Sequence, residues 1–165
     1  MPATIWDWRR GEVVDRVGTS AEFVEFDPTG GLIATSRPVE GIADVWDPRT
    51  GRQAATLTAS AHVLDIAFDA SGTRLATAHA DGSIRLWDPE TGVQDLVLHS
   101  DDHEAHTVAF SPDGSMLLST DDAGVARVWA LDLDDLVDIA HARLTREFSE
   151  DECRQYLHLE RCSDA

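Results

Sequence analysis

A module of about forty residues recurs along this chain, and the repetition constrains the fold more than any other feature. Tryptophans recur at intervals of 40, 41 and 42 residues, at Trp6, Trp46, Trp87 and Trp129. Phenylalanines recur at intervals of 42 residues, at Phe26, Phe68 and Phe110, and a similar turn sequence follows each. Periods of about 40–45 residues are typical of proteins in which each copy forms one small sheet that stacks on its neighbours.

The segment from Leu75 to Gly92 shows the pattern of one copy most clearly. Its first residues, 75–78, are short and apolar, as expected of a strand. Asp81 and Gly82 then supply the positive φ angles of a two-residue hairpin turn. Residues 84–87 alternate apolar and polar side chains, the period of a half-buried strand. Pro89 and Gly92 end that strand, because proline cannot donate to a strand ladder.

The segment resembles part of a WD repeat, which is named for the Trp-Asp pair that stands here as Trp87-Asp88. The resemblance extends over about residues 3–129. It implies a β-propeller, in which four-stranded antiparallel sheets stack around an axis. We therefore expect an all-β fold, a partial propeller of about three four-stranded blades and a half blade, followed by a short helical tail.

The predicted propeller segment covers residues 1–131, in units of about 1–20, 21–60, 61–103 and 104–131. The first unit starts in mid-blade and the last lacks its outer strand, so the repeats amount to thirteen strands and form an open arc. We interpret the chain as the C-terminal part of a longer protein. In an alternative hypothesis, two chains each lend the strand at 13–17 to the other's last blade. From residue 132 to 165 the apolar period becomes helical, for example at Leu133, Leu136 and Leu144.

The resemblance also implies a structural hydrogen-bonded network in each blade. In the third unit its members are Trp87, Thr77 and Asp81, with His62 as a candidate fourth member. In the second and fourth units, Glu40 and Ala123 stand near the Asp position, so neither unit is expected to build the full network. The corresponding tryptophans of the other units are Trp6, Trp46 and Trp129.

Charge and composition narrow the classes of partner. The chain has 31 acidic and 13 basic residues and a net charge of −18. This balance argues against nucleic acids and anionic membranes, which require positive patches, and favours basic or neutral protein partners. The sequence shows no apolar run of transmembrane length and no secretory signal pattern, so we expect a cytoplasmic location. We expect no cofactor.

Two groups of metal-ligating residue types have alternative interpretations. His99, His103 and His106 share a loop with acidic residues and form a candidate metal site, or simply a solvated polar loop. Cys153 and Cys162 either form a disulfide or remain two unpaired thiols. A continuous helix would place them about 13 Å apart, which is too far for a disulfide, so pairing would require a break in the helix.

No nucleophile motif or phosphate-binding loop is recognisable, and Glu25 and Asp65 are single acids on separate innermost strands, too sparse for catalysis. We therefore expect no enzyme activity, but a protein-interaction scaffold or sensor module with Trp8 as a candidate partner contact. Residues 144–158 resemble the ends of bacterial, especially actinobacterial, signalling proteins. The alternatives are a fragment that completes the propeller of a signal-transduction ATPase or kinase, and a metal-dependent propeller enzyme. Self-association through the open edges is a further expectation.

Overall fold

The computed structural model describes residues 3–7, 9–17, 21–37, 41–100 and 103–132. Apart from Asp132, these belong to the first of two units into which the chain divides, Met1–Leu131 and Asp132–Ala165. The predicted helices beyond residue 132 and the Cys153–Cys162 pair lie outside the described residues. Within the described residues, no helix is long and apolar enough to cross a membrane.

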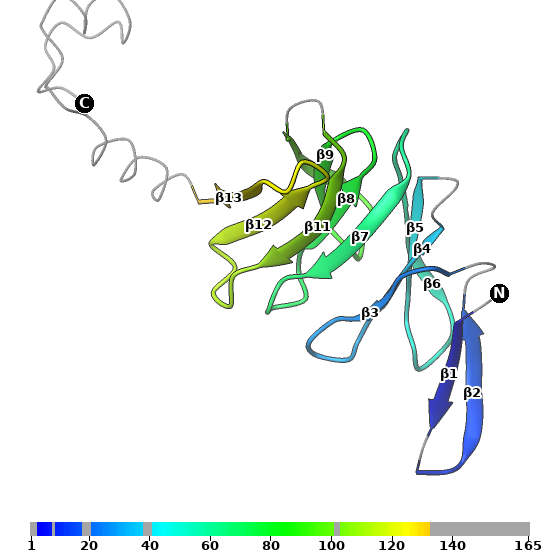
Figure 1. The fold of residues 1–165 in the computed structure, drawn as a ribbon. Coiled ribbons are helices and arrows are strands. Elements are labelled where there is room, and N and C mark those ends of the chain that lie inside the picture. The colour runs from blue at the N-terminus through cyan, green and yellow to red at the C-terminus, as the bar shows by residue number, and fades with distance from the viewer. Residues whose placement is uncertain (1–2, 8, 18–20, 38–40, 101–102, 133–165) are drawn as a thin grey trace, which may run out of the picture. The chain divides into compact units, whose positions relative to one another are not determined.

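The described residues form four antiparallel sheets, and in each sheet neighbouring strands follow one another in the sequence (Figure 1). The first two sheets hold β1 (Ala3–Asp7) and β2 (Glu12–Val17), then β3 (Val24–Phe26), β4 (Ile33–Arg37), β5 (Ile42–Trp46) and β6 (Gln53–Thr58). The last two hold β7 (Val63–Phe68), β8 (Leu75–His79), β9 (Ser83–Trp87) and β10 (Gln94–His99), then β11 (Ala105–Phe110), β12 (Met116–Asp121) and β13 (Ala126–Ala130). The expected all-β fold of partial-propeller type is confirmed.

The aspartate after each of the first three repeated tryptophans shapes the turn that follows it. The Asp88 carboxylate accepts hydrogen bonds from the backbone N–H groups of Glu90 and Thr91, and its carbonyl accepts one from Gly92. The same pattern follows Asp7 and Asp47. Gly92 has a φ of +73°, a conformation that other residues rarely adopt. The Trp-Asp pair therefore marks the end of one strand and the start of the turn that leads to the next strand.

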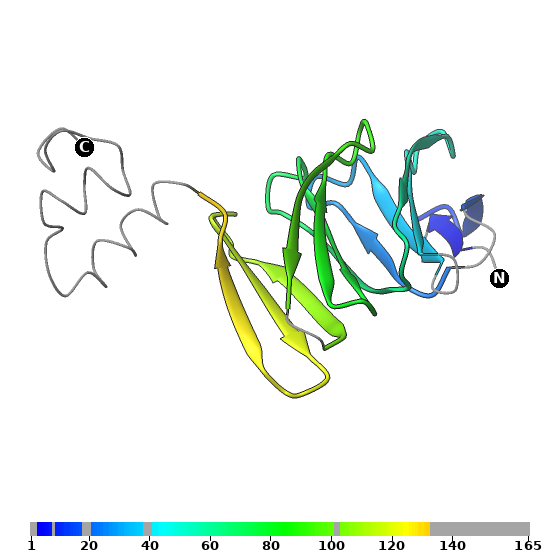
Figure 2. The same cartoon turned by 90° about the horizontal axis from the view of Figure 1, so that it is seen from above.

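Two apolar clusters hold the three larger sheets together, and Figure 2 shows these sheets in chain order. We call the face of a sheet that looks toward the preceding sheet its front face, and the opposite face its rear face. The first cluster joins the rear face of β3–β6 to the front face of β7–β10, and includes Ala34, Val45, Leu57, Phe68, Leu75 and Trp87. The second joins the rear face of β7–β10 to the front face of β11–β13, and includes Ala76, Ile84, Leu86, Val108 and Leu117.

Candidate functional site

Each of the three larger sheets joins its tryptophan to a hydroxyl group on the adjacent strand. The indole N–H donates to that hydroxyl oxygen, so a polar group on a large apolar ring is satisfied inside the packing between sheets. The pairs are Trp46–Thr35 at 3.0 Å, Trp87–Thr77 at 2.8 Å and Trp129–Ser119 at 2.9 Å. The second and fourth units thus make the tryptophan–hydroxyl pair, although they were not expected to complete the whole network.

In the third unit this pair extends into a buried chain of hydrogen bonds. The Thr77 hydroxyl lies 2.7 Å from Nε2 of His79, and Nδ1 of His79 lies 3.1 Å from the Ala61 carbonyl oxygen. Because a carbonyl only accepts, Nδ1 carries the proton and donates it to Ala61. Nε2 is then the acceptor for the Thr77 hydroxyl, whose oxygen accepts from Trp87. The imidazole is neutral in this arrangement, and all three side chains are buried.

The histidine of this network is His79, so the prediction that named His62 is wrong. His62 is exposed and takes part only through its carbonyl oxygen, which accepts from the Ala80 N–H at 3.0 Å. His79 is the member because it follows Thr77 by two residues on β8, and alternate residues of a strand share a face.

Asp81, which the sequence predicts as a member of the network beside Trp87 and Thr77, shapes the hairpin turn between β8 and β9. Its carboxylate accepts from the N–H of Ser83 at 3.0 Å and from the Ser83 hydroxyl at 2.5 Å, and it pairs with Arg85 at 3.5 Å. Burial acts to raise the pKa of Asp81, but the Ser83 hydrogen bonds outweigh it and hold the pKa below its usual value. Asp81 contacts Ser83 and Arg85, and its negative charge opposes the lowering of the pKa of His79.

A second set of front-face positions carries ion pairs that the sequence analysis did not identify. In the second unit, Arg37 on β4 donates from Nε to the buried Asp44 carboxylate on β5 at 3.0 Å. In the fourth unit, the corresponding positions hold Asp121 and Arg127, which pair with the charges exchanged. In the third unit these positions hold His79 and Arg85. The repeat period of 42 or 41 residues could have revealed these pairs, because it aligns Arg37 with Asp121 and Asp44 with Arg127.

Two carboxylates connect neighbouring sheets directly. Oε1 of Glu25 on β3 accepts from the Phe68 N–H on β7 at 3.3 Å, and Oδ2 of Asp65 on β7 accepts from the Val108 N–H on β11 at 3.0 Å. Burial raises the pKa of Glu25, the bond from Phe68 opposes the rise, and the charge of Asp65 adds to it. These acids therefore bind the backbone of the next blade, a role that requires no catalytic chemistry.

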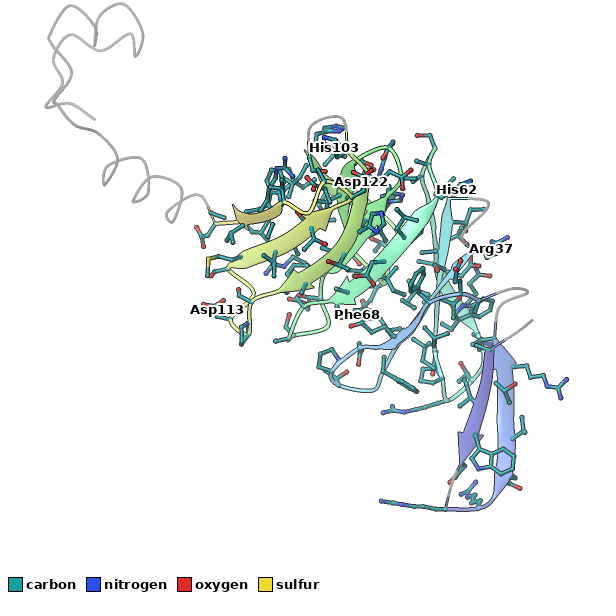
Figure 3. All side chains as sticks on the ribbon, viewed as in Figure 1. Arg37, His62, Phe68, His103, Asp113 and Asp122 are labelled. Carbon is teal, nitrogen blue, oxygen red and sulfur yellow. The ribbon has the colours of Figure 1, made fainter. Side chains whose placement is uncertain are left out.

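Two of the three candidate metal ligands lie beside neighbouring acids. Nδ1 of His103 lies 3.1 Å from the Asp122 carboxylate, and Nε2 of His106 lies 3.7 Å from that of Glu104. Figure 3 shows His103 beside Asp122 at one end of the sheets, with Asp113 at the opposite end. His99 is exposed on β10. In the part of the chain that the structure describes, no group of three His, Cys, Asp or Glu residues could hold a metal ion.

The first repeated tryptophan differs from the other three. Trp6 lies on β1, whose described sheet contains only β1 and β2, so it has no neighbouring hydroxyl-bearing strand. Trp6 is 58% exposed, in contrast to Trp87, which packs between two sheets. Trp8, the candidate partner contact, lies outside the described residues.

The buried histidine predicts a loss of stability in mildly acidic solution. Burial lowers the pKa of His79 below its usual value of 6.5, and the charge of Arg85 adds to the effect. The unfolded chain binds a proton at this histidine near pH 6.5, whereas the folded protein does not. The free energy of unfolding should therefore be unaffected by this group above pH 6.5, and fall as the pH drops below it, by at most about 1.4 kcal/mol per pH unit.

Urea denaturation at a series of pH values measures this dependence. His79→Gln should flatten the slope between neutral pH and about pH 5, because the titrating ring is gone. His62→Gln is the matched control, since His62 is exposed, and should leave the slope unchanged. Equal slopes for wild type and His79→Gln would contradict the assignment of a neutral, buried His79.

Comparison with known proteins agrees with this geometry. The family described as "WD domain, G-beta repeat" matches residues 51–88 and 92–130. Nuclear distribution protein PAC1 of Arthroderma benhamiae is 32% identical over 139 residues, which are 76% of this chain and 30% of that protein. The WD repeat-containing protein 91 homolog of Dictyostelium discoideum is 28% identical over 135 residues, 76% of this chain and 18% of that protein.

The chain therefore spans less than a third of the length of these curated relatives. Both relatives are eukaryotic, so they give no support to the bacterial origin inferred from residues 144–158. WD repeats imply a protein-interaction scaffold role. The matched segments, the recurring tryptophan–hydroxyl pairs and the stacked sheets identify residues 51–130 as WD repeats of the G-beta type.

Proposed function

We propose that this chain is a binding module for basic or neutral protein segments within a regulatory or signalling protein of the cytoplasm. The observation that supports this proposal is a set of stacked WD repeats whose buried polar groups make structural hydrogen bonds and ion pairs. The acidic balance of the chain, with a net charge of −18, favours partners that bring positive charge. The resemblance of residues 144–158 to the tails of signalling proteins supports the regulatory setting.

Acids at both ends of the sheets support their own turns, Asp81 and Asp121 among them, but the end that carries Asp122 also holds two acids that are used differently. At the end that carries Asp113, acids such as Asp69 and Asp113 accept hydrogen bonds from their own turns (Figure 3). At the opposite end, the half-exposed Glu104 and Asp122 side chains contact imidazole groups. Carboxylates that do not support their own loops can exchange partners at little structural cost. We therefore place the partner surface at the end that carries Asp122.

A peptide-display experiment tests this proposal. A library of random dodecapeptides is selected against the immobilised chain, and selected peptides are measured by fluorescence anisotropy. We expect enrichment of Lys and Arg, and binding that weakens as salt is added. Glu104→Gln combined with Asp122→Asn should weaken binding severalfold, whereas Glu90→Gln, an exposed acid on another turn, should not. Enrichment no greater than on an uncoated surface would overturn the proposal.

We also propose that the open faces of the sheets support self-association. Exposed apolar side chains lie on the outermost faces of the stacked sheets, which favours association through them.

A further inference from the structure

The rear faces of the sheets carry equivalent residues, but only two of them are covered. In β3–β6 this face presents Ala34, Ala43 and Val45, and in β7–β10 it presents Ala76, Ala78, Ile84 and Leu86. All of these side chains are buried against the next sheet. Positions 76, 84 and 86 recur 42 residues later as Leu118, Ala126 and Val128 on the rear face of β11–β13. There Leu118 is 44% exposed and Val128 is 66% exposed.

The composition of this last face does not suit solvent. A strand with one solvated face places polar residues on it, and Leu118 and Val128 lie opposite each other on neighbouring strands of that face. Leu118 is also larger and more apolar than Ala76, which it replaces in the repeat. The last rear face therefore keeps the chemistry of a contact between blades, and no described residue buries it.

The front faces show the complementary pattern. In β7–β10 the front face presents Ile66, Phe68, Leu75 and Trp87, all buried against the preceding sheet. In β3–β6 the residues that correspond to Ile66 and Phe68 are Val24 and Phe26, which are 50% and 54% exposed. The first full sheet thus leaves open the kind of surface that the rear faces of the earlier sheets contact inside the chain.

We propose that a second copy of this chain covers the last rear face, by placing its Val24–Phe26 front face on Leu118 and Val128. This inference rests on the proposed self-association and specifies its geometry. The contact repeats an interface that the chain already makes twice, between β3–β6 and β7–β10 and between β7–β10 and β11–β13. Because different faces meet, the contact is head-to-tail, and it closes into a ring or extends into a filament according to the rotation between copies.

The carboxylates between sheets predict the strength of this contact. Glu25 accepts from the Phe68 N–H, and the residue that corresponds to Glu25 on β11 is Ala109. The backbone N–H of Asp27 donates to the Leu32 carbonyl oxygen at 3.1 Å. In an antiparallel ladder the next pair of opposite residues, Phe26 and Ile33, therefore exchanges no backbone hydrogen bonds. The Phe26 N–H therefore points off the free edge of β3. The contact between copies lacks the acid that holds this group within the chain, and should be weaker than the internal contacts.

Complementation of two association-deficient variants tests the head-to-tail geometry. Light scattering after size exclusion, from low to several hundred micromolar and at moderate salt to screen the net charge, should show masses above 18.0 kDa for the wild type. Val128→Asp disables the rear face and Phe26→Asp the front face, so each variant alone should be monomeric. Both residues are more than half exposed, so the fold should tolerate either change. An equimolar mixture retains one intact contact and should form a heterodimer.

Each other outcome overturns the proposal. A wild type that stays at 18.0 kDa throughout excludes a second copy as the occupant and leaves the face to another protein. Self-association of Phe26→Asp equal to that of wild type indicates a symmetric contact between rear faces. Leu118→Gln is a second rear-face variant and should behave as Val128→Asp does. Peptide binding by a monomeric chain would sustain the proposed function while this inference fails.

A gain-of-function variant examines the missing carboxylate. Ala109→Glu places an acid at the position that corresponds to Glu25, within reach of the Phe26 N–H of the next copy. A charge-assisted hydrogen bond of this kind should tighten association roughly tenfold. Ala109→Lys, of similar length but opposite charge, cannot accept from an N–H and should give no such gain. Equal effects of Glu and Lys would show that the Phe26 edge does not meet this position.

Discussion

Replacing Trp87 by alanine is expected to lower the free energy of unfolding by about 3–5 kcal/mol. Trp87 is 4% exposed and packs in the cluster that joins the second and third sheets. The change leaves a cavity at this interface and also deprives the Thr77 hydroxyl of its indole donor. Urea denaturation followed by far-UV circular dichroism measures the loss, since tryptophan fluorescence itself changes with the substitution.

Trp6→Ala is the matched control for this prediction, because the same residue type stands at the same place in the repeat. Trp6 is 58% exposed, so its removal should cost less than about 1 kcal/mol. Trp46 and Trp129 are half-buried and should fall between these extremes. Similar losses for Trp87→Ala and Trp6→Ala would show that packing between blades does not govern the stability of the repeats.

The strands and turns could be predicted from the sequence because local chemistry determines them. The turn predicted at Asp81-Gly82 lies between β8 and β9 and Gly82 has a φ of +76°, but the loop holds three residues, 80–82, where two were expected. The repeated Trp-Asp pair ends a strand in each of the first three copies because its carboxylate caps the following turn. Each of these features depends on residues within one copy, so each feature recurs with the period of the sequence.

The histidine of the buried network was misassigned for a reason that lies in the strand pairing. The repeat pattern places its histidine at the entry of the blade and so points to His62, whereas the side chain that reaches Thr77 belongs to His79. The alternation along β8 contains this information, because residues 75, 77 and 79 share a face. The exposure of Trp6 could not be predicted in the same way, since it depends on which strands flank β1.

The contacts between sheets could not be predicted from one copy. Glu25 and Asp65 looked like isolated acids, and only stacking brings each to a backbone N–H 43 residues away. The two acids also do not occupy equivalent positions, because the residue that corresponds to Glu25 on β7 is Ala67, which pairs with Ala76 as Glu25 pairs with Ala34. Long-range bonds of this kind depend on the relative placement of blades, which the repeat period leaves open.

Replacing Asp44 by alanine is expected to lower the free energy of unfolding by about 3 kcal/mol. The Asp44 side chain is 4% exposed and accepts from Arg37, from Gln53 at 2.8 Å and from Thr56 at 3.0 Å. Its loss leaves a partly buried guanidinium group without this counter-charge, and the Thr56 hydroxyl and the Gln53 amide each lose one acceptor. Urea denaturation measures the change. Asp95→Ala, at an exposed position on β10, should alter stability by no more than about 0.5 kcal/mol.

The exchange of charges between units provides a sharper test of the same site. The fourth unit pairs Asp121 with Arg127 at the positions that hold Arg37 and Asp44 in the second unit. Asp44→Arg alone places two guanidinium groups together and should destabilise the protein more than Asp44→Ala does. Adding Arg37→Asp reproduces the arrangement of the fourth unit and should recover a substantial part of that loss. Recovery stays incomplete, because Gln53 and Thr56 lose their acceptor. Losses that merely add in the double variant would show that the two positions are not energetically coupled.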